Sequence, residues 1–276
     1  MIPQTIEQSQ VARLLPKRPL DSHKGMFGTV VVIGGASGMT GAALLAARSA
    51  LKLGAGCVHA VLLADDAPSV DFVQPELMLH NSHALLPNAT VLLAGCGMGT
   101  DRRAQKLLTE ALQSAAALVL DADALNLIAA HIELRNLAVA RKNPTVLTPH
   151  PGEAARLLSC STKQIQDDRI AAVQQMSNTF ACSVVLKGAD SLCATRCGLF
   201  VNHTGNPGMS APGMGDVLAG MIASFIAQGL NADDALLLAV HLHGAAGDEL
   251  AKQRAIGMTA TEVTDQARSL LNQWGS

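Results

Sequence analysis

The chain of 276 residues is long enough for one large α/β domain or two small ones. Hydrophobic residues make up 49% of it and charged residues 15%, which excludes a disordered chain and supplies ample material for a buried core. A net charge of −2, an aromatic content of 2% and the lack of tyrosine exclude a basic or base-stacking surface for nucleic acid.

No targeting segment is recognisable in the sequence. No apolar run reaches the roughly 18 residues that a transmembrane helix needs. The N-terminal MIPQTIEQSQ lacks the charged start and the apolar core of a signal peptide. Six scattered cysteines suit reduced thiols better than a disulfide framework. We therefore expect a cytoplasmic enzyme that acts on a small molecule and binds neither nucleic acid nor membrane.

Six continuous apolar runs alternate with helical patterns, as is typical of strands buried on both faces of a parallel sheet. The predicted strands are Thr29–Ile33, Cys57–Leu63, Thr90–Ala94, Ala117–Asp121, Thr145–Thr148 and Ser183–Lys187. The predicted helices between them are Thr40–Leu53, Arg102–Ser114, Ala124–Ala130, Glu153–Leu158 and Lys163–Asn178. This alternation predicts a three-layer α/β fold, with a central, mostly parallel sheet flanked by helices.

The pattern changes in the last third of the chain. Ser191–Thr195 and Gly198–Asn202 predict a hairpin, and residues 213–228, 232–251 and 260–272 predict helices. No Pro-, Ser- or Gly-rich linker and no repeat interrupts the sequence. We therefore expect one domain over residues 1–276, with residues 1–23 as a helical N-terminal extension.

The first predicted strand runs into a glycine-rich turn. Gly35-x-x-Gly38-x-x-Gly41 precedes a helix, the context of a dinucleotide-binding fingerprint, and Asp65 and Asp66 follow at about the distance of a ribose contact. A strand-to-helix turn packed closely on the sheet explains the same glycines. A short-chain reductase is disfavoured, because the tyrosine that would serve as its proton donor is absent.

A second turn, Gly95-Cys-Gly97-Met-Gly99, follows the predicted strand Thr90–Ala94. Three alternating glycines allow backbone N–H groups to approach an anion or a ring. A tight turn explains them equally well.

The most informative turn runs from Asn206 to Asp216 and opens an apolar helix. Glycines before a helix leave N–H donors bare at the positive end of the helix dipole, which favours phosphate. Asp216 is either a simple N-cap or a base that takes a proton from an attacking hydroxyl. The low pKa expected at a helix N-terminus is compatible with the second role, because the hydroxyl acidifies late in a loose transition state.

Four further polar residues end predicted strands. Lys187 ends a buried strand, where an unpaired ammonium is costly, so we expect a phosphate or carboxylate partner. His150 lies between two prolines and is either held rigidly for binding or is a buried structural histidine. Asp121 and Asp123 are expected to order local backbone or a metal-bound water.

Several classes of site are excluded by missing motifs. No lysine is followed by Ser or Thr, so there is no Walker-type phosphate loop, and H-E-x-x-H and G-x-S-x-G are absent. His241 and His243 are two residues apart on a predicted helix and should point apart, so we do not expect them to form a metal pair.

Gly-x-Gly-Asp opening a late helix in an alternating chain resembles the ribokinase-like superfamily. The full set of motifs is similar to a narrower family, the ADP-dependent NAD(P)H-hydrate dehydratases, which repair hydrated nicotinamide cofactors. The motifs are KGMFGTVVVIGGASGMTGAALLAARSALKLGAG (24–56), AGCGMGTD (94–101), LDADALN (120–126), TPHPGEAARLL (148–158), LKGADS (186–191) and GNPGMSAPGMGDVLAG (205–220).

The resemblance implies roles for individual residues. It assigns Ala43, Gly99, His150 and Asp216 to the hydrated dinucleotide, with Asp216 also as the catalytic base. The implied site for ADP or AMP consists of Lys187, Gly188, Ala189, Asp190, Ser191, Asn206, Pro207, Gly208, Met209, Ser210, Ala211, Pro212, Gly213, Met214 and Gly215. It implies Mg²⁺ as the ion that neutralises the phosphates, and no side chain as a dedicated metal ligand.

The resemblance also implies a reaction, that of a hydro-lyase. ADP would phosphorylate the hydroxyl of NADHX or NADPHX, and phosphate would then leave, giving AMP, phosphate and NADH or NADPH. We further expect a homo-oligomer, a tetramer in the first instance, and functional pairing with a separate NAD(P)HX epimerase. The epimerase domain that is fused upstream in some members has no room here.

Two alternatives remain at this point. An ATP-dependent kinase of the same fold would phosphorylate a vitamin-precursor alcohol and stop there. A non-catalytic regulator would bind an adenine nucleotide without turning over any substrate. The product, phosphorylated alcohol or restored dinucleotide, distinguishes these readings.

Overall fold

The computed structural model describes residues 2–15, 17–81 and 88–275. Within them, ten strands form one sheet in the order β1-β10-β9-β8-β7-β6-β5-β2-β3-β4. Among these strands β9 alone runs antiparallel to its neighbours. The strands are β1 Gln4–Thr5, β2 Thr29–Gly34, β3 Cys57–Leu62, β4 Met78–His80, β5 Val91–Ala94, β6 Ala117–Leu120, β7 Thr145–Leu147, β8 Ser183–Leu186, β9 Ser191–Thr195 and β10 Gly198–Asn202.

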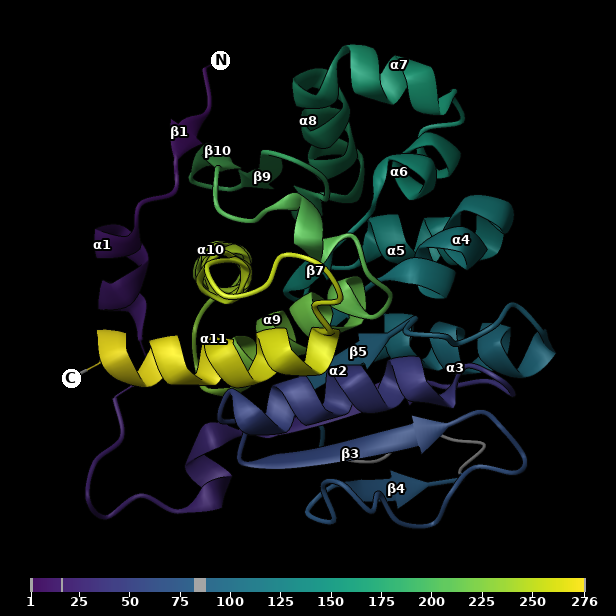
Figure 1. Ribbon diagram of the computed structural model, residues 1–276. Helices are drawn as coiled ribbons and strands as arrows, with labels where there is room; N and C mark the ends of the chain where they lie inside the picture. The colour runs from purple at the N-terminus through teal and green to yellow at the C-terminus, as the bar shows by residue number, and fades with distance from the viewer. Residues whose placement is uncertain (1, 16, 82–87, 276) are drawn as a thin grey trace.

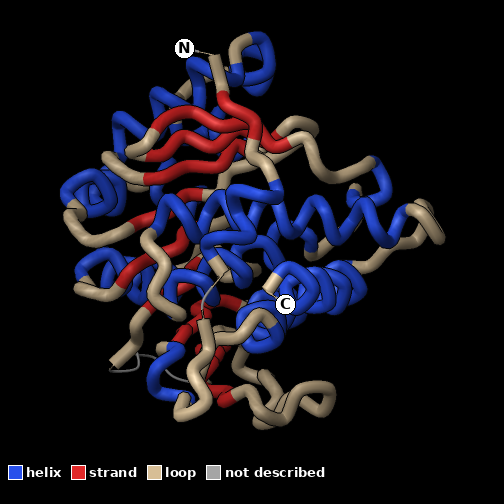
Figure 2. The backbone as a smooth tube through the Cα atoms, turned by 90° about the vertical axis from the view of Figure 1, so that its left-hand side faces the viewer, coloured by secondary structure: helices blue, strands red, loops and turns tan. Residues whose placement is uncertain are grey.

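Helices cover both faces of this sheet (Figures 1 and 2). One hydrophobic cluster joins one face to α2, α9, α10 and α11, and a second joins the other face to α3–α8. The α-helices are α1 Gln8–Val11, α2 Thr40–Lys52, α3 Arg102–Gln113, α4 Ala122–Ala130, α5 Ile132–Ala140, α6 Pro151–Leu157, α7 Thr162–Asp167, α8 Arg169–Phe180, α9 Met214–Ala227, α10 Ala232–Ala251 and α11 Ala260–Trp274. Short 3₁₀ turns are η1 Ala12–Leu14, η2 Lys24–Phe27 and η3 Pro207–Met209.

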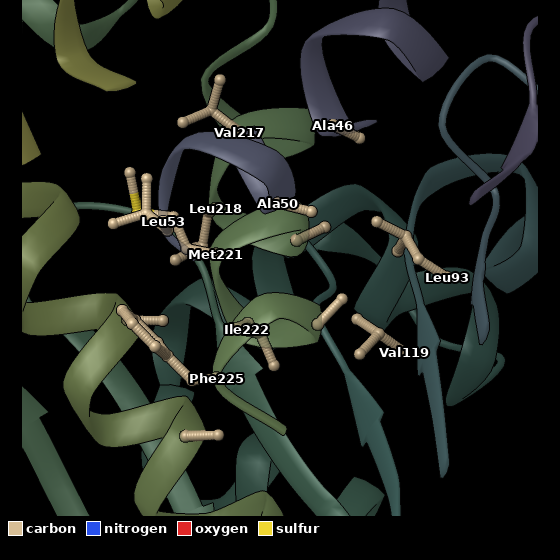
Figure 3. Close-up of a cluster of buried hydrophobic side chains, with 14 of the residues drawn as sticks. Ala46, Ala50, Leu53, Leu93, Val119, Val217, Leu218, Met221, Ile222 and Phe225 are labelled. Carbon is tan, nitrogen blue, oxygen red and sulfur yellow. The ribbon is translucent and has the colours of Figure 1, made fainter. Parts of the chain in front are cut away.

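Helix α9 is the centre of the first cluster. Its sequence is apolar around its whole circumference, and such a helix is stable only when neighbours cover every side. Figure 3 shows Met221, Ile222 and Phe225 of α9 near Leu53, which follows α2, and near Val119 of β6. These contacts fix the first turn of α9 relative to the ends of the central strands.

The predicted fold class is confirmed, and the six predicted strands agree with the structure to within one residue at either end. Their residues are buried on both faces, as continuous apolar runs predict. The predicted helix Lys163–Asn178 is two helices, because Asp168 leaves the helical conformation (φ −145°, ψ 78°) and caps α8 through Ala171 N–H. Helix α5 and strand β4 were not predicted.

The N-terminal segment 1–23, expected to be helical, contains little helix among its described residues. It forms β1, the single turn α1 and η1. No helix in the part of the chain that the structure describes is long and apolar enough to cross a membrane.

Strand β2 lies between β3 and β5: the chain adds β3 and β4 on one side of β2 and then returns to add β5 on the other, so the strand order reverses there. In open α/β sheets, ligands bind beyond the carboxyl ends of the strands at such a reversal. The polar residues singled out in the sequence follow β5, β6, β7 and β8 and therefore lie at this end of the sheet.

Candidate active site

Lys187 follows β8 and is held by two carboxylates. Its Nζ lies 2.7 Å from Asp121 Oδ1 and 3.9 Å from Glu153 Oε2. Asp121 Oδ1 also accepts a hydrogen bond of 2.6 Å from Thr148 Oγ1. Burial alone would lower the pKa of Lys187, but Asp121 and Glu153 outweigh burial and raise it. The expected carboxylate partner is confirmed, and Lys187 is a permanent cation at the ends of β6–β8.

Asp216 lies in the first turn of α9, but it does not cap the helix. The N-cap is Gly213, in the left-handed conformation (φ 88°), and Asp216 is the third helical residue. The interpretation of Asp216 as an N-cap is therefore wrong. The expected low pKa is also wrong, because burial and the neighbouring carboxylate of Asp121 raise the pKa of Asp216 to about 6. The neighbouring Cys96 thiol and the charge of Lys187 act in the opposite direction and lower this pKa.

His150 is the N-cap of α6 and is not a buried histidine, since half of its side chain is exposed. Its Nδ1 accepts a hydrogen bond of 2.9 Å from Gly152 N, and Glu153 Oε2 accepts one of 2.8 Å from His150 N. Burial, Lys187 and Arg156 lower the pKa of His150, so the ring is neutral at pH 7. With Nδ1 used as an acceptor, the ring proton is on Nε2, which leaves no free lone pair for a base.

The turns after β2 and β5 pack on each other. Gly35 N donates to Cys96 O (3.0 Å) and Ala36 N donates to Gly97 O (2.7 Å). This supports the close strand-to-helix turn rather than a dinucleotide fingerprint for the first glycine motif. Asp65, the first expected ribose contact, points instead to Arg103 and is almost fully exposed.

Two residues expected at the dinucleotide lie in these turns or below them. Gly99 N donates a hydrogen bond of 2.8 Å to Asp123 Oδ2, so Asp123 orders backbone as expected. Ala43, by contrast, is fully buried, and its side chain packs beneath Gly35. Gly99 is therefore partly accessible to a ligand, whereas the side chain of Ala43 is not accessible.

A cavity of about 520 Å³ lies beside Lys187, between the β8–β9 loop, the β10–α9 loop and helices α9 and α10. All five residues of Lys187–Ser191 line it, together with Asn206, Pro207, Met209, Ser210, Met214 and Gly215. The other expected nucleotide residues, Gly208, Ala211, Pro212 and Gly213, do not line it. Residues that the sequence reasoning missed complete the wall: Asn202, His203, Thr204, Gly205, Leu218, Val240, His243 and Gly244.

The two loops of this cavity are tied together and to α10. His203 Nδ1 lies 2.7 Å from Asp190 Oδ1, which links the loops. Asp248 of α10 accepts hydrogen bonds from Gly205 N (2.9 Å) and from Asn206 Nδ2 (3.0 Å). The cavity is therefore largely preformed, which reduces the entropy lost when a ligand binds.

His243 was considered in the sequence only as half of a metal pair. Its Nε2 is buried without a partner among the described residues, and burial and Lys187 lower its pKa to about 4. The ring of His241 lies 5.9 Å from that of Trp274, away from the cavity. The predicted divergence of the two histidines is confirmed, but the neutral His243 lines the cavity, a position that burial on an apolar helix could have suggested.

Cys96, Asp121 and Asp216 each place one possible ligand atom within 4.8 Å of the others. These side chains do not fit Mg²⁺, which prefers oxygen ligands and octahedral geometry. The thiol is a soft ligand, and Asp121 Oδ1 is already occupied by Lys187 and Thr148. Within the described residues, this cluster is therefore not a magnesium site built from side chains.

A mostly parallel sheet between helices, a cavity at the N-terminus of a late helix and a carboxylate in its first turn define the ribokinase-like class. The structure of a ribokinase-like superfamily protein from Enterococcus faecalis is similar over 98% of this chain and 96% of that protein, with a TM-score of 0.85 and 28% identity.

The chain belongs to the NAD(P)H-hydrate dehydratase family, whose model matches residues 30–268 and whose members are hydro-lyases. It is 43% identical to the ADP-dependent (S)-NAD(P)H-hydrate dehydratase of Neisseria meningitidis, over 93% of this chain and 89% of that protein. It resembles the Bacillus subtilis ADP/ATP-dependent NAD(P)H-hydrate dehydratase, crystallised with ATP and Mg²⁺, at 27% identity and a TM-score of 0.88 over 99% of both chains. It spans about half the length of the bifunctional NAD(P)H-hydrate repair enzymes that it also matches.

Proposed function

We propose that this protein dehydrates (S)-NADHX and (S)-NADPHX to NADH and NADPH, while converting ADP to AMP and phosphate. One observation carries the proposal beyond family membership. Asp216, with a pKa of about 6, directly follows Gly215 of the cavity wall and lies beside Asp121, which pairs with Lys187 at the ends of β6–β8. A carboxylate of this basicity is ionised at pH 7 and accepts a proton more readily than an exposed aspartate.

In the first step, the hydroxyl of the hydrate loses its proton to the Asp216 carboxylate while its oxygen attacks the terminal phosphorus of ADP. The bond from that phosphorus to the bridging oxygen breaks, and AMP leaves. Developing charge on the transferred group is met by the N–H groups of the first turn of α9 and by the Lys187 ammonium. Gly215, without a side chain, allows the phosphate to approach this turn.

In the second step, the phosphorylated hydrate loses phosphate. The lone pair of the ring nitrogen expels the phosphate as the C–O bond breaks, and a proton leaves the neighbouring carbon to restore the double bond. Phosphate is a much better leaving group than hydroxide, which explains why a fold of this class serves a dehydration. Each turnover consumes one ADP and releases one AMP and one phosphate.

The cavity beside Lys187 has the size and the wall expected for the adenine nucleotide. Its volume of about 520 Å³ falls within the usual range for small-molecule sites. His150 and Gly99 lie outside the cavity wall and are proposed to contact the hydrated dinucleotide. Because His150 is neutral, its Nδ1 is used in capping and its Nε2 lies 3.2 Å from Glu153 Oε1, its role there is positioning rather than proton transfer.

Magnesium is proposed to arrive with the nucleotide rather than to be held by a side-chain cage. Mg²⁺ commonly keeps its waters and binds through substrate phosphates, where it neutralises their charge. The crystallisation of the Bacillus subtilis relative with ATP and Mg²⁺ supports this view.

The test is a direct assay with purified NADHX and NADPHX. Recovery of the reduced-nicotinamide absorbance is followed with ADP, ATP or no nucleotide, and AMP and phosphate are quantified in the same samples. We expect recovery that depends on ADP, with one AMP and one phosphate formed per dinucleotide. Accumulation of a phosphorylated product without recovery would instead support the kinase. Tight nucleotide binding without turnover of any substrate would support a regulator.

A further inference from the structure

The cysteine in the β5 turn lies beside the base. Cys96 is fully buried, and its Sγ lies within 4.8 Å of carboxylate oxygens of both Asp121 and Asp216. The two side chains shift each other's pKa: the thiol lowers that of Asp216, and Asp216 raises that of the thiol. The reaction described above gives this thiol no chemical task.

The backbone around Cys96 is fixed more tightly than an ordinary turn. Cys96 O accepts the hydrogen bond from Gly35 N, and a Cβ placed on Gly34 would come within 2.2 Å of the same oxygen. The turn after β2 therefore holds Cys96 in place from one side while α9 presents Asp216 from the other. A contact between two such fixed elements is preorganised.

The direction of a hydrogen bond between these two side chains follows from the charges around them. Burial, Asp216 and Asp121 raise the pKa of the Cys96 thiol well above its ordinary value, so the sulfur keeps its proton throughout the working pH range. A protonated thiol beside a carboxylate can only donate to it. Asp121 Oδ1 already accepts from Lys187 and Thr148, whereas no other side chain among the described residues donates to Asp216, so we take Asp216 as the acceptor.

We propose that Cys96 is a positioning residue for Asp216: its S–H donates to the carboxylate, fixes the orientation of that group and stabilises its ionised form. The proposal rests on the proposed function, since it takes Asp216 as the base. It gives the Cys96 side chain a role in the site, in addition to any role of the backbone of this glycine-rich turn.

The titratable groups facing Asp216 lie beyond the ends of three other strands. They are Cys96 beyond β5, Asp121 and Asp123 beyond β6, and Lys187 beyond β8. The two carboxylates raise the pKa of Asp216, whereas the thiol and the ammonium lower it. Removing the thiol thus takes away one of the two groups that favour the ionised base.

The experiment compares Cys96→Ala, Cys96→Ser and a matched control, Cys193→Ala. Cys193 is equally buried in the same hydrophobic cluster but lies on β9, and burial rather than Asp216 raises the pKa of its thiol. For each variant, kcat/KM for NADHX is measured against pH at saturating ADP. Thermal unfolding is measured in parallel, to show that each variant is folded.

We expect the acidic limb of the Cys96→Ala profile to move up by about half to one pH unit, which lowers kcat/KM at pH 6 by about 2- to 5-fold. Cys96→Ser, whose hydroxyl still donates, should return the limb to its wild-type position or below, and Cys193→Ala should leave it unchanged. A Cys96→Ala profile that loses rate equally at all pH values would overturn the proposal and leave Cys96 as packing only.

A second readout needs no turnover. The carboxyl carbon of Asp216 is titrated by NMR in ¹³C-labelled wild type and Cys96→Ala, and its resonance is assigned by its loss in Asp216→Asn. A higher pKa in Cys96→Ala supports the hydrogen bond, and an unchanged pKa overturns it. Because this titration is independent of catalysis, a failure of the proposed function appears only in the assay, whereas a failure of the present inference appears in both measurements.

Discussion

Two glycine-rich turns that look alike in the sequence differ in the space around them. The turn after β2 is filled by protein, because Gly34 and Gly35 pack against Cys96 and Ala43. The turn before α9 borders a cavity, and the nearest group to a Cβ on Gly215 would be the Lys187 ammonium, at 3.1 Å. Glycine in the first turn serves packing between two loops, whereas in the second it leaves room for a ligand beside a cation.

The sharpest test of this difference is Asp216→Asn, in the turn that borders the cavity. Asparagine keeps the shape of the side chain but cannot accept a proton, so we expect dehydration to fall by about 100-fold or more. Binding of ADP should persist, because a negative charge near the phosphates is removed. Dehydration rate and ADP affinity are measured on the same preparation, and a near-wild-type rate would exclude Asp216 as the base.

The same variant should be more stable than the wild type at neutral pH. Folding raises the pKa of Asp216 from 3.8 to about 6, so the folded state favours the protonated form. Stability that this group contributes is therefore present below pH 4 and lost as pH rises through 6. We expect the free energy of unfolding of Asp216→Asn to exceed that of the wild type by about 3 kcal/mol above pH 6 and to equal it below pH 4, as followed by denaturant unfolding.

On the cavity side, Gly215→Val should weaken ADP binding by about 10-fold or more, because its methyl groups would displace Lys187 from the first turn of α9. Backbone strain is not the cause, since the left-handed residue of this turn is Gly213. Gly215→Ala should have a smaller effect in the same direction. Calorimetric titration with ADP measures both, and unchanged affinity in a folded valine variant would place the nucleotide elsewhere.

In the filled turn, Gly34→Ala should lower stability by about 1–3 kcal/mol, because the new Cβ would meet Cys96 O at 2.2 Å. The folded fraction should bind ADP normally, since Gly34 does not line the cavity. Gly41→Ala, seven residues further on in α2, is the matched control. Nothing lies within 4 Å of a Cβ there, so its unfolding free energy should change by no more than about 0.5 kcal/mol.

His150 tests the side of the site away from the cavity. His150→Ala should raise KM for the hydrate by about 5- to 10-fold and lower kcat less, because a positioning contact acts mainly on binding. It also removes the N-cap of α6, so His150→Asn, which can still cap, is the control for stability. A selective loss of kcat in both variants would give His150 a chemical role instead.

The strands of the sheet were predicted well from the sequence because each is a short, continuous apolar run between two helical patterns, which is typical of a strand buried on both faces. Strand β4 has only three residues, and its partly exposed side chains make no such run. The break at Asp168 was missed because the apolar spacing continues across it, although an aspartate before a helix is a common cap. The periodicity of apolar residues therefore reveals neither a short edge strand nor a helix break at a single residue.

The polar site was predictable in part. The cost of an unpaired ammonium at the end of a buried strand predicts a partner for Lys187, and the structure supplies Asp121 and Glu153. The pKa of Asp216 was not predictable, because it depends on Asp121, which is 95 residues away in the chain. The positions of Cys96 beside Asp216 and of His243 in the cavity wall likewise could not be predicted, because they depend on packing between distant elements rather than on a motif.

Strand β1 gives the first residues of the chain a protective role. Gln4 and Thr5 pair with Phe200 and Val201, and Ile6 N donates to Val201 O at 2.9 Å. A chain that starts after Ile6 would leave these β10 backbone groups unpaired at the end of the sheet. Unpaired edges of this kind recruit strands from other molecules, so such a truncation should promote aggregation. Because β10 leads directly into the wall of the cavity, the same truncation would loosen the nucleotide site from a distance.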